Sequence, residues 1–417
     1  MAEKQHRLVI LGSMDEFVDL VEHAKSRGYY TIVVDGYEDG PAKLHADKAY
    51  LEDVRHTDEI VNICKQEEAD GIIASFSDLL AECLANIADA AGLRCYIKPE
   101  GEVYLREKPL MKKMFSDLGI DSPKFRKVHR ETLAKDLEDM EFPCVIKPVN
   151  GYGSHGIFVA GSIDDVQKGF GQSVSRSNFD YLMAEEYNSG REFNVITWVA
   201  DKKAHVLSIA DREKETFREG DIPQVTRVVY VSDLSSKLKG EFEEIATKIA
   251  GYVGLNDGPL CIQAFYDENR GISVCEAAGR IFGYEHELVT LGSGLHIESL
   301  LLDSVYDPDR AKSRIATHDS NFGTIAAGLY FHGYDGEVAD VGKMDELSRL
   351  DGVVAYQAYY RPGDNITHGP GAKPYVARYY LAAPNREVVD RLSSEIIDQV
   401  SVLDPDGKEL LFRLEKK

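Results

Sequence analysis

A strand followed by a glycine-rich loop is the part of this 417-residue chain with the clearest chemical potential. The strand ends at Lys147-Pro148, and the loop that follows contains Gly151, Gly153, Ser154 and Gly156. Glycines allow backbone N–H groups to approach phosphate oxygens, and a hydroxyl and a lysine add a donor and a positive charge. The loop is not a Walker A motif, because no Gly-Lys-Ser/Thr opens a helix. An ordinary hairpin explains it equally well.

A second predicted hairpin, formed by residues 260–266 and 271–276, contains or precedes three further candidate residues. Glu276 lies at its end, Gln263 lies in its first strand, and Arg280 comes four residues after Glu276. A carboxylate beside a phosphate loop is the ligand type that Mg²⁺ prefers. The planar guanidinium of Arg280 suits a carboxylate or an acyl phosphate. Taken singly, each of these residues is also typical of an ordinary surface turn.

A third candidate segment joins two predicted strands. It contains Glu185, Glu186, Asn188 and Glu192. Acidic side chains and free backbone groups at such a turn can bind the amino edge of adenine and the hydroxyls of ribose. The three segments together favour a nucleotide site.

The elements that must position these residues begin with alternating strands and helices. We expect strands at 7–11, 30–34 and 71–74, and helices at 16–27, 57–67 and 78–91. This alternation predicts βαβ units with a parallel sheet, an α/β arrangement. A dinucleotide fingerprint is absent, because the turn at Gly12-Ser13 has one glycine where the motif needs three.

A second region begins with a predicted helix from Lys108 to Leu118 and continues with a β-rich pattern to about residue 302, as expected of an α+β domain. The final region has predicted strands at 323–331, 353–360 and 375–382, followed by a helix at 386–400. This pattern predicts a small α+β terminal domain.

The amino-acid composition indicates which kinds of molecule the protein is not expected to bind. The chain has 48 basic and 71 acidic residues and a net charge of −23. We therefore expect neither nucleic acid nor an anionic membrane as the main partner, because both need a concentrated basic surface. No run approaches the roughly 20 apolar residues of a membrane-spanning helix. The N-terminus has no signal-peptide pattern, and the six cysteines have no CxxC pairing, so a cytoplasmic protein with reduced cysteines is expected.

In this order and spacing the motifs resemble the ATP-grasp superfamily, especially its carboxylate–amine (L-amino-acid) ligases and the carbamoyl phosphate synthetase large chain. The resemblance covers essentially the whole chain. It implies a preATP-grasp, Rossmann-like domain at 1–107, an ATP-grasp domain of two α+β subdomains at 108–305, and a C-terminal α+β domain at 306–417.

The resemblance assigns roles residue by residue. It implies that Lys108 and Lys147 contact phosphates and that residues 151–156 form a mobile loop over them. Glu185, Glu186 and Asn188 would hold adenine, and Glu192 the ribose. Glu276 matches the magnesium-binding glutamate, and Arg280 matches an arginine that faces the substrate carboxylate or acyl phosphate. Lys147 and Arg280 are therefore the candidate catalytic residues.

Two positions depart from the family pattern. Gln263 stands where the first acidic metal ligand is usual, and Ala278 stands where asparagine is common. Glutamine offers a carbonyl oxygen but no charge, so the metal would depend more on Glu276, the phosphates and water. Further candidate substrate residues are Arg212 and Lys214, which follow a predicted strand, and His286, which lies close behind Arg280.

The function implied by the resemblance is an ATP-dependent, ADP-forming ligase. It would activate a carboxylate as an acyl phosphate, which an amine attacks to form an amide or peptide bond. ATP and Mg²⁺ (or Mn²⁺) are the expected cofactors, the partners are small molecules, and a homodimer is possible. The alternatives are a bicarbonate-activating enzyme like carbamoyl phosphate synthetase and a non-catalytic nucleotide-binding module, which Gln263 and Ala278 motivate.

Overall fold

The computed structural model describes residues 4–150, 156–214, 224–368 and 372–412. These residues divide into two compact units. The first unit comprises Met1–Leu207, Lys237–His286 and His296–His318, and the second comprises Ser208–Ser236, Glu287–Leu295 and Asp319–Lys417. The division into three domains made from the sequence stays a prediction.

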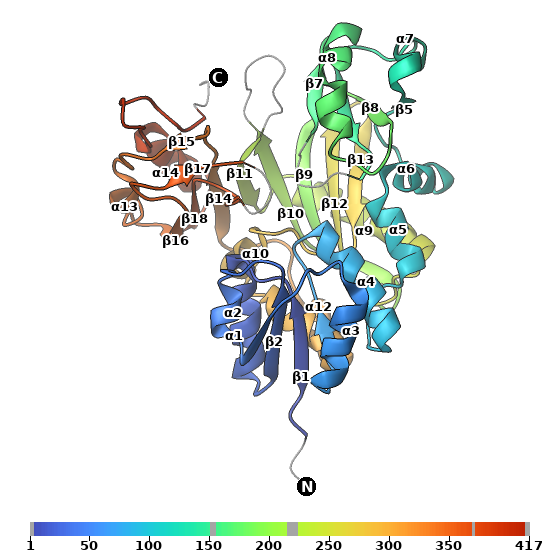
Figure 1. The fold of residues 1–417 in the computed structure, drawn as a ribbon, viewed down its shortest axis with the longest axis vertical. Helices are drawn as coiled ribbons and strands as arrows, with labels where there is room; N and C mark the ends of the chain where they lie inside the picture. Colours follow the sequence, from blue (N-terminus) through green and yellow to red (C-terminus); the bar gives the residue numbers. More distant parts are fainter. Residues whose placement is uncertain (1–3, 151–155, 215–223, 369–371, 413–417) are drawn as a thin grey trace. The chain divides into compact units, whose positions relative to one another are not determined.

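The first unit starts with a four-stranded parallel sheet (Figure 1). In spatial order its strands are β3 (Lys48–Leu51), β2 (Tyr30–Asp35), β1 (Arg7–Leu11) and β4 (Gly71–Ile73). The accompanying helices are η1 (Asp15–Phe17), α1 (Val18–Ser26), α2 (Ala42–His45), α3 (Thr57–Gln66) and α4 (Asp78–Ala91). Strands β1 and β2 are almost wholly buried, as is typical of parallel strands covered by crossover helices. The predicted βαβ arrangement is confirmed.

The turn after β1 shows why a glycine follows this strand. Gly12 has a φ of +108°, and a Cβ atom there would lie 2.5 Å from the ring of Phe17. Both the backbone angle and the aromatic ring exclude a side chain at this position. The hydroxyl of Ser13 donates to Asp35 at the end of β2 (2.9 Å), so the turn is tied to the next strand.

A second, antiparallel sheet has its own small core. Its strands, in spatial order, are β5 (Phe125–Val128), β8 (Leu182–Glu186), β6 (Cys144–Pro148) and β7 (Phe158–Ala160). The accompanying helices are η2 (Arg130–Thr132), α7 (Leu133–Asp136) and α8 (Ile163–Val174). Ile146 and Leu182 of the sheet share a buried cluster with Val166 and Phe170 of α8. This packing fixes the strands that carry Lys147 and Glu185.

The rest of the first unit is built on three antiparallel strands. They are β13 (Gly271–Ala278), β12 (Gly258–Asp267) and β9 (Arg191–Ala200), with β12 in the centre. The helices of this part are α5 (Pro99–Arg106), α6 (Lys108–Asp117), α9 (Ser235–Val253), α11 (Ile297–Tyr306) and α12 (Pro308–Thr317). Strand β10 (Lys203–Lys214) begins in this unit and ends in the second.

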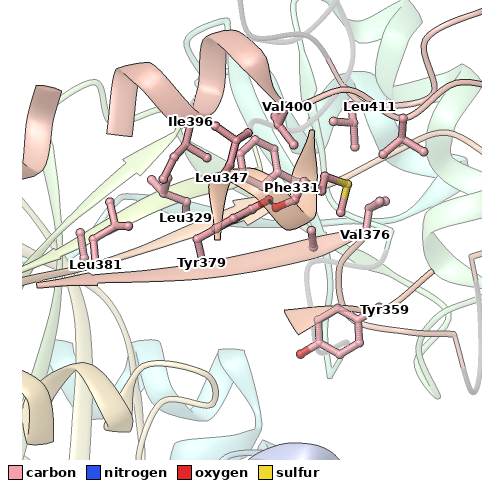
Figure 2. Packing of buried hydrophobic residues seen from close by; sticks show 14 of the residues in the cluster. Leu329, Phe331, Leu347, Tyr359, Val376, Tyr379, Leu381, Ile396, Val400 and Leu411 are labelled. Atoms are coloured by element: carbon pink, nitrogen blue, oxygen red, sulfur yellow. Dashed lines mark hydrogen bonds between the residues drawn. The ribbon is translucent and has the colours of Figure 1, made fainter. Parts of the chain in front are cut away.

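The second unit is an antiparallel sheet covered by helix α14 (Arg386–Gln399). After β10 its strands are, in spatial order, β11 (Val225–Tyr230), β14 (Ile325–Phe331), β18 (Ala377–Ala383) and β16 (Val353–Ala358). The short elements are α10 (His286–Ser293), β15 (Gly336–Glu337), α13 (Met344–Leu347) and β17 (Asn365–Ile366). Figure 2 shows Ile396 of α14 close to Leu329, Phe331 and Tyr379 of the sheet, all in one buried cluster.

The sequence predicted most of these elements correctly. The strand expected at 7–11 is β1, and the helix expected at 78–91 is α4, with identical bounds. The C-terminal strands and helix also form, with ends that differ from the prediction by at most two residues. All six cysteines are free, as expected. Among the described helices none has by itself the length and apolar character of a membrane span, although α10 and α11 meet these criteria as a bent pair.

Candidate active site

A buried cluster of two lysines and one glutamate lies where strands β6 and β8 run side by side. Val145 is the register partner of Glu185, and Lys147 is two residues further along β6, so Lys147 and Glu185 share one face of the sheet. Lys147 Nζ lies 2.7 Å from Glu185 Oε2, and Lys112 Nζ lies 3.5 Å from Glu185 Oε1. Lys112 also donates to the hydroxyl of Ser122 (2.7 Å). The cluster holds one more positive than negative charge.

In this cluster the attraction between opposite charges outweighs the effect of burial, which by itself would favour the neutral forms. Burial would raise the pKa of Glu185, but Lys112 and Lys147 outweigh it and lower that pKa to about 2. Burial would likewise lower the pKa of Lys147, yet its neighbours Cys275 and Glu185 raise it above the usual range. Both groups are therefore ionised at neutral pH, and Lys147 presents a permanent positive charge.

Lys108 opens helix α6 and belongs to the same electrostatic environment. Burial lowers its pKa, Glu276 counteracts this, and the positive charge of Lys147 adds to the lowering. Lys112 is four residues further along α6 and therefore lies on the same face of the helix as Lys108. Three lysines thus converge on one region. Their combined positive charge suits the binding of several phosphate oxygens.

Oxygen-bearing side chains form a row across the three central strands. Glu276 of β13 is the register partner of Gln263 in β12, which is in turn the partner of Asn194 in β9. Gln263 donates through its amide nitrogen to Glu192 on β9, so its carbonyl oxygen remains available as an acceptor. Asn194 donates to Glu285 (2.7 Å).

The row has the donor chemistry of a Mg²⁺ site. The buried Oδ1 atom of Asn194 has no hydrogen-bond partner among the described residues. A buried acceptor without a partner is costly unless a donor or a cation satisfies it. Glu276 supplies a negative charge, and Gln263 and Asn194 supply neutral oxygens, a set that Mg²⁺ accepts when phosphates and water complete its shell. The expected metal ligands Glu276 and Gln263 are thus adjacent, and Asn194 joins them.

Arg280 is held by an aspartate that the sequence analysis did not single out. Its Nε atom lies 2.7 Å from Oδ1 of Asp78, the first residue of α4. Burial would lower the pKa of Arg280, but Asp78 outweighs it and raises that pKa. The pair joins residues 202 positions apart, and spacing along the chain gives no signal for such a contact.

Glu102 is a further buried acid near this arginine. It is 3% exposed, and its Oε2 atom has no hydrogen-bond partner among the residues described. Burial, together with the negative charges of Asp78 and Glu82, raises its pKa to about 8. Glu102 is therefore largely a neutral acid at physiological pH.

Each of the residues expected to bind adenine or ribose has a protein partner in this structure. Glu185 is bound to lysines, and Glu186 lies 3.1 Å from Arg270. Asn188 accepts a hydrogen bond from the backbone N–H of Gly190 (2.9 Å) and so stabilises the turn itself. Glu192 is bound to Gln263. These contacts leave the assignments as predictions for the nucleotide-bound protein.

Part of the glycine loop lies outside the described residues, namely Gly151, Gly153 and Ser154. Gly156 is described, with a φ of +77°, a backbone angle that favours glycine. Its carbonyl accepts a hydrogen bond from the hydroxyl of Ser173 (2.6 Å), which anchors the end of the loop on α8.

His286 is enclosed by other side chains. It is fully buried, its ring is stacked on Phe76 with centroids 4.2 Å apart, and its Nε2 atom lies 3.1 Å from Glu298. Burial would raise the pKa of Glu298, but its hydrogen bond to His286 lowers it to about 2. A histidine enclosed in this way contributes to the packing of α11. A substrate contact by His286 stays a prediction.

Arg212 and Lys214 belong to the part of β10 that lies in the second unit. Glu213, between them, binds Arg227 and Arg386. Arg386 also binds Asp211 (2.7 Å). The charged run is thus partly an ion-pair network of the second unit, and a substrate role for Arg212 and Lys214 stays a prediction.

Comparison with known proteins identifies the domain that carries several of these residues. Residues 140–286 match the model of the ATP-grasp domain. A formate-dependent phosphoribosylglycinamide formyltransferase from Methanocaldococcus jannaschii is 23% identical over 60% of this chain and 63% of its own length. The chain therefore spans less than two thirds of the length of this curated relative.

Solved structures cover nearly the whole chain. An L-amino acid ligase from Bacillus licheniformis superposes with a TM-score of 0.80, covering 97% of this chain and 100% of the ligase, at 18% identity. The biotin carboxylase domain of the Hydrogenobacter thermophilus 2-oxoglutarate carboxylase, in complex with MgADP and bicarbonate, has a TM-score of 0.72 and 15% identity over 98% of this chain and 92% of that domain. This protein contains an ATP-grasp domain and has the fold of ATP-grasp proteins.

Proposed function

We propose that this protein is an ATP-dependent ligase that converts a carboxylate into an acyl phosphate and transfers the acyl group to an amine. The observation that carries the proposal is the convergence of Lys108, Lys112 and Lys147 near Glu276. Positive charge to bind phosphates beside an oxygen-rich metal site is the arrangement that phosphoryl transfer requires.

In the proposed reaction a carboxylate oxygen attacks the γ-phosphorus of ATP, and the bond to the β,γ-bridging oxygen breaks with release of ADP. The amine nitrogen then attacks the acyl carbon, phosphate leaves, and the amine loses a proton. Lys108 and Lys147 stabilise the phosphate oxygens, and Arg280, held by Asp78, orients the carboxylate. Mg²⁺ held by Glu276 with Gln263 and Asn194 would neutralise phosphate charge.

The experiment is a measurement of ADP release with Mg-ATP and a panel of carboxylates and amines. The panel begins with formate and phosphoribosylglycinamide, which the name of the curated relative specifies, and with pairs of L-amino acids, after the ligase of the same fold. Added hydroxylamine should trap an acyl phosphate as a hydroxamate. We expect ADP release that depends on both substrates; release with bicarbonate alone would favour carbamoyl phosphate synthetase-like chemistry.

Gln263 favours a second candidate, a nucleotide-binding module without turnover. Its amide is bound to Glu192, and it replaces an acidic ligand expected at this position. ATP binding with no ADP release across the panel, and none gained by Gln263→Glu, would support the module over the ligase.

A further inference from the structure

Two histidines and a glutamate come together away from the ATP site, where α1 packs on α11. His23 lies in the last turn of α1, His296 immediately precedes α11, and Glu298 lies in its first turn. One ligand atom from each of the three side chains lies within 4.8 Å of the other two. The rings of His23 and His296 have centroids 5.0 Å apart.

Neighbouring groups orient two of the three side chains, Glu298 and His23. Glu298 is 3% exposed and directs Oε1 at the buried His286, 3.1 Å away. His23 places Nδ1 3.5 Å from the hydroxyl of Ser299, so its Nε2 atom is free to bind another group. Metal-binding histidines and carboxylates are commonly oriented by such outer contacts on the atom that does not bind the metal.

The two helices that carry the donors are also joined by an ion pair. Arg27, which follows α1, lies 2.6 Å from Asp303 of α11. The donors therefore stand on a pre-organised scaffold and need only small rotations. A tetrahedral zinc site with bonds of about 2.0 Å has donors about 3.3 Å apart. The half-buried His23 and the exposed His296 are free to make this adjustment.

We propose that His23, His296 and Glu298 form a binding site for a divalent transition-metal ion of the zinc type. Two imidazoles and one carboxylate suit Zn²⁺ and not Mg²⁺, which prefers oxygen ligands alone. Three protein donors leave the fourth tetrahedral position for water, and the exposure of His296 gives the ion a route of entry. The bound ion fastens α1 to α11 and thereby stabilises the fold.

The test is equilibrium binding of ZnCl₂ to the full-length, chelator-treated protein without nucleotide, followed by competition with a chromogenic chelator and by elemental analysis. We expect one Zn²⁺ per chain and a higher melting temperature with zinc. His23→Ala and His296→Ala should each weaken binding by at least about tenfold, because each removes a direct ligand. These side chains are not fully buried, so both variants should fold.

Control variants distinguish this site from other zinc ligands. His45→Ala removes an exposed histidine that binds Glu22, Cys95→Ser removes the most accessible thiol, and Glu276→Gln removes the candidate ATP-site ligand. All three should bind zinc as the unmodified protein does. Absence of zinc binding, undiminished binding by His296→Ala, or loss of binding in Glu276→Gln would overturn the proposal. The measurement needs no turnover, so its result is independent of the ligase proposal.

Discussion

Lys147 Nζ lies 2.7 Å from Oε2 of Glu185, and both side chains are buried on one face of the sheet formed by β6 and β8. The pair keeps a positive charge in place before any phosphate binds. Glu185 also binds Lys112, so it organises two lysines at once. A preorganised charge costs little reorganisation when the ligand arrives.

Replacing Lys147 should therefore affect ATP binding directly. We expect Lys147→Ala to raise the Kd of Mg-ATP by at least about tenfold, since a charge-assisted contact is worth about 1.5–3 kcal/mol. Isothermal titration calorimetry measures this change, and circular dichroism checks that the variant is folded. Lys127→Ala, which removes an exposed lysine of β5, is the control and should leave the Kd unchanged. Unaltered ATP binding by the Lys147 variant would contradict the phosphate-site assignment.

Glu185 should make stability depend on pH in the acid range. Its pKa is about 2 in the folded protein, against an ordinary value of 4.5 in the unfolded chain, so its stabilisation is full above pH 4.5 and is lost as pH falls towards 2. The difference corresponds to a contribution on the order of 3 kcal/mol. The gap in unfolding free energy between the unmodified protein and Glu185→Gln, measured with urea, should shrink from pH 5 to pH 3. A gap independent of pH would refute the pairing.

Glu102 should make the protein less stable as pH rises, which is the opposite of the effect of Glu185. Its pKa is raised to about 8, so ionisation opposes folding between the unfolded value near 4.5 and pH 8. Glu102→Gln, which stays neutral, should gain stability relative to the unmodified protein as pH rises from 5 to 8, with a constant difference above that. Urea unfolding across this range measures the effect, and Glu138→Gln at an exposed site is the control. A difference that falls with pH would disprove the neutral state.

Arg280 should matter for turnover more than for nucleotide affinity. Arg280→Lys keeps the charge but loses the planar fork that Asp78 orients. With substrates identified, we expect kcat to fall by at least about tenfold while the Kd of ATP stays within about twofold. Arg94→Lys, at an exposed position, should change neither quantity. An equal loss of ATP affinity would instead make Arg280 a nucleotide contact.

The substitution Gln263→Glu tests whether the row of Glu276, Gln263 and Asn194 binds Mg²⁺. In the free protein the new carboxylate faces Glu192 where an amide donated before, so the melting temperature should fall. Mg²⁺ should relieve this repulsion and bind more tightly to the variant, which a lower half-saturating Mg²⁺ concentration for ATP binding would reveal. An unchanged Mg²⁺ requirement would remove Gln263 from the metal site.

The sequence by itself determined the local elements and the order of the motifs. Strand β1 and helix α4 follow from hydrophobic periodicity, which depends only on neighbouring residues. The glycines, Lys147 and Glu276 were recognisable because their types and order along the chain carry the chemistry. Lys112 had a local signal as well, since it lies one helical turn after Lys108.

Only the tertiary structure decided which side chains meet. Asp78 binds Arg280 across 202 positions, and Asn194 reaches the row of Gln263 and Glu276 through strand register. The position of His286 shortly after Arg280 gave no sign that its ring would stack on Phe76 and that its Nε2 atom would lie beside Glu298. Such contacts depend on how distant elements pack, and burial, not spacing along the chain, raises the pKa of Glu102.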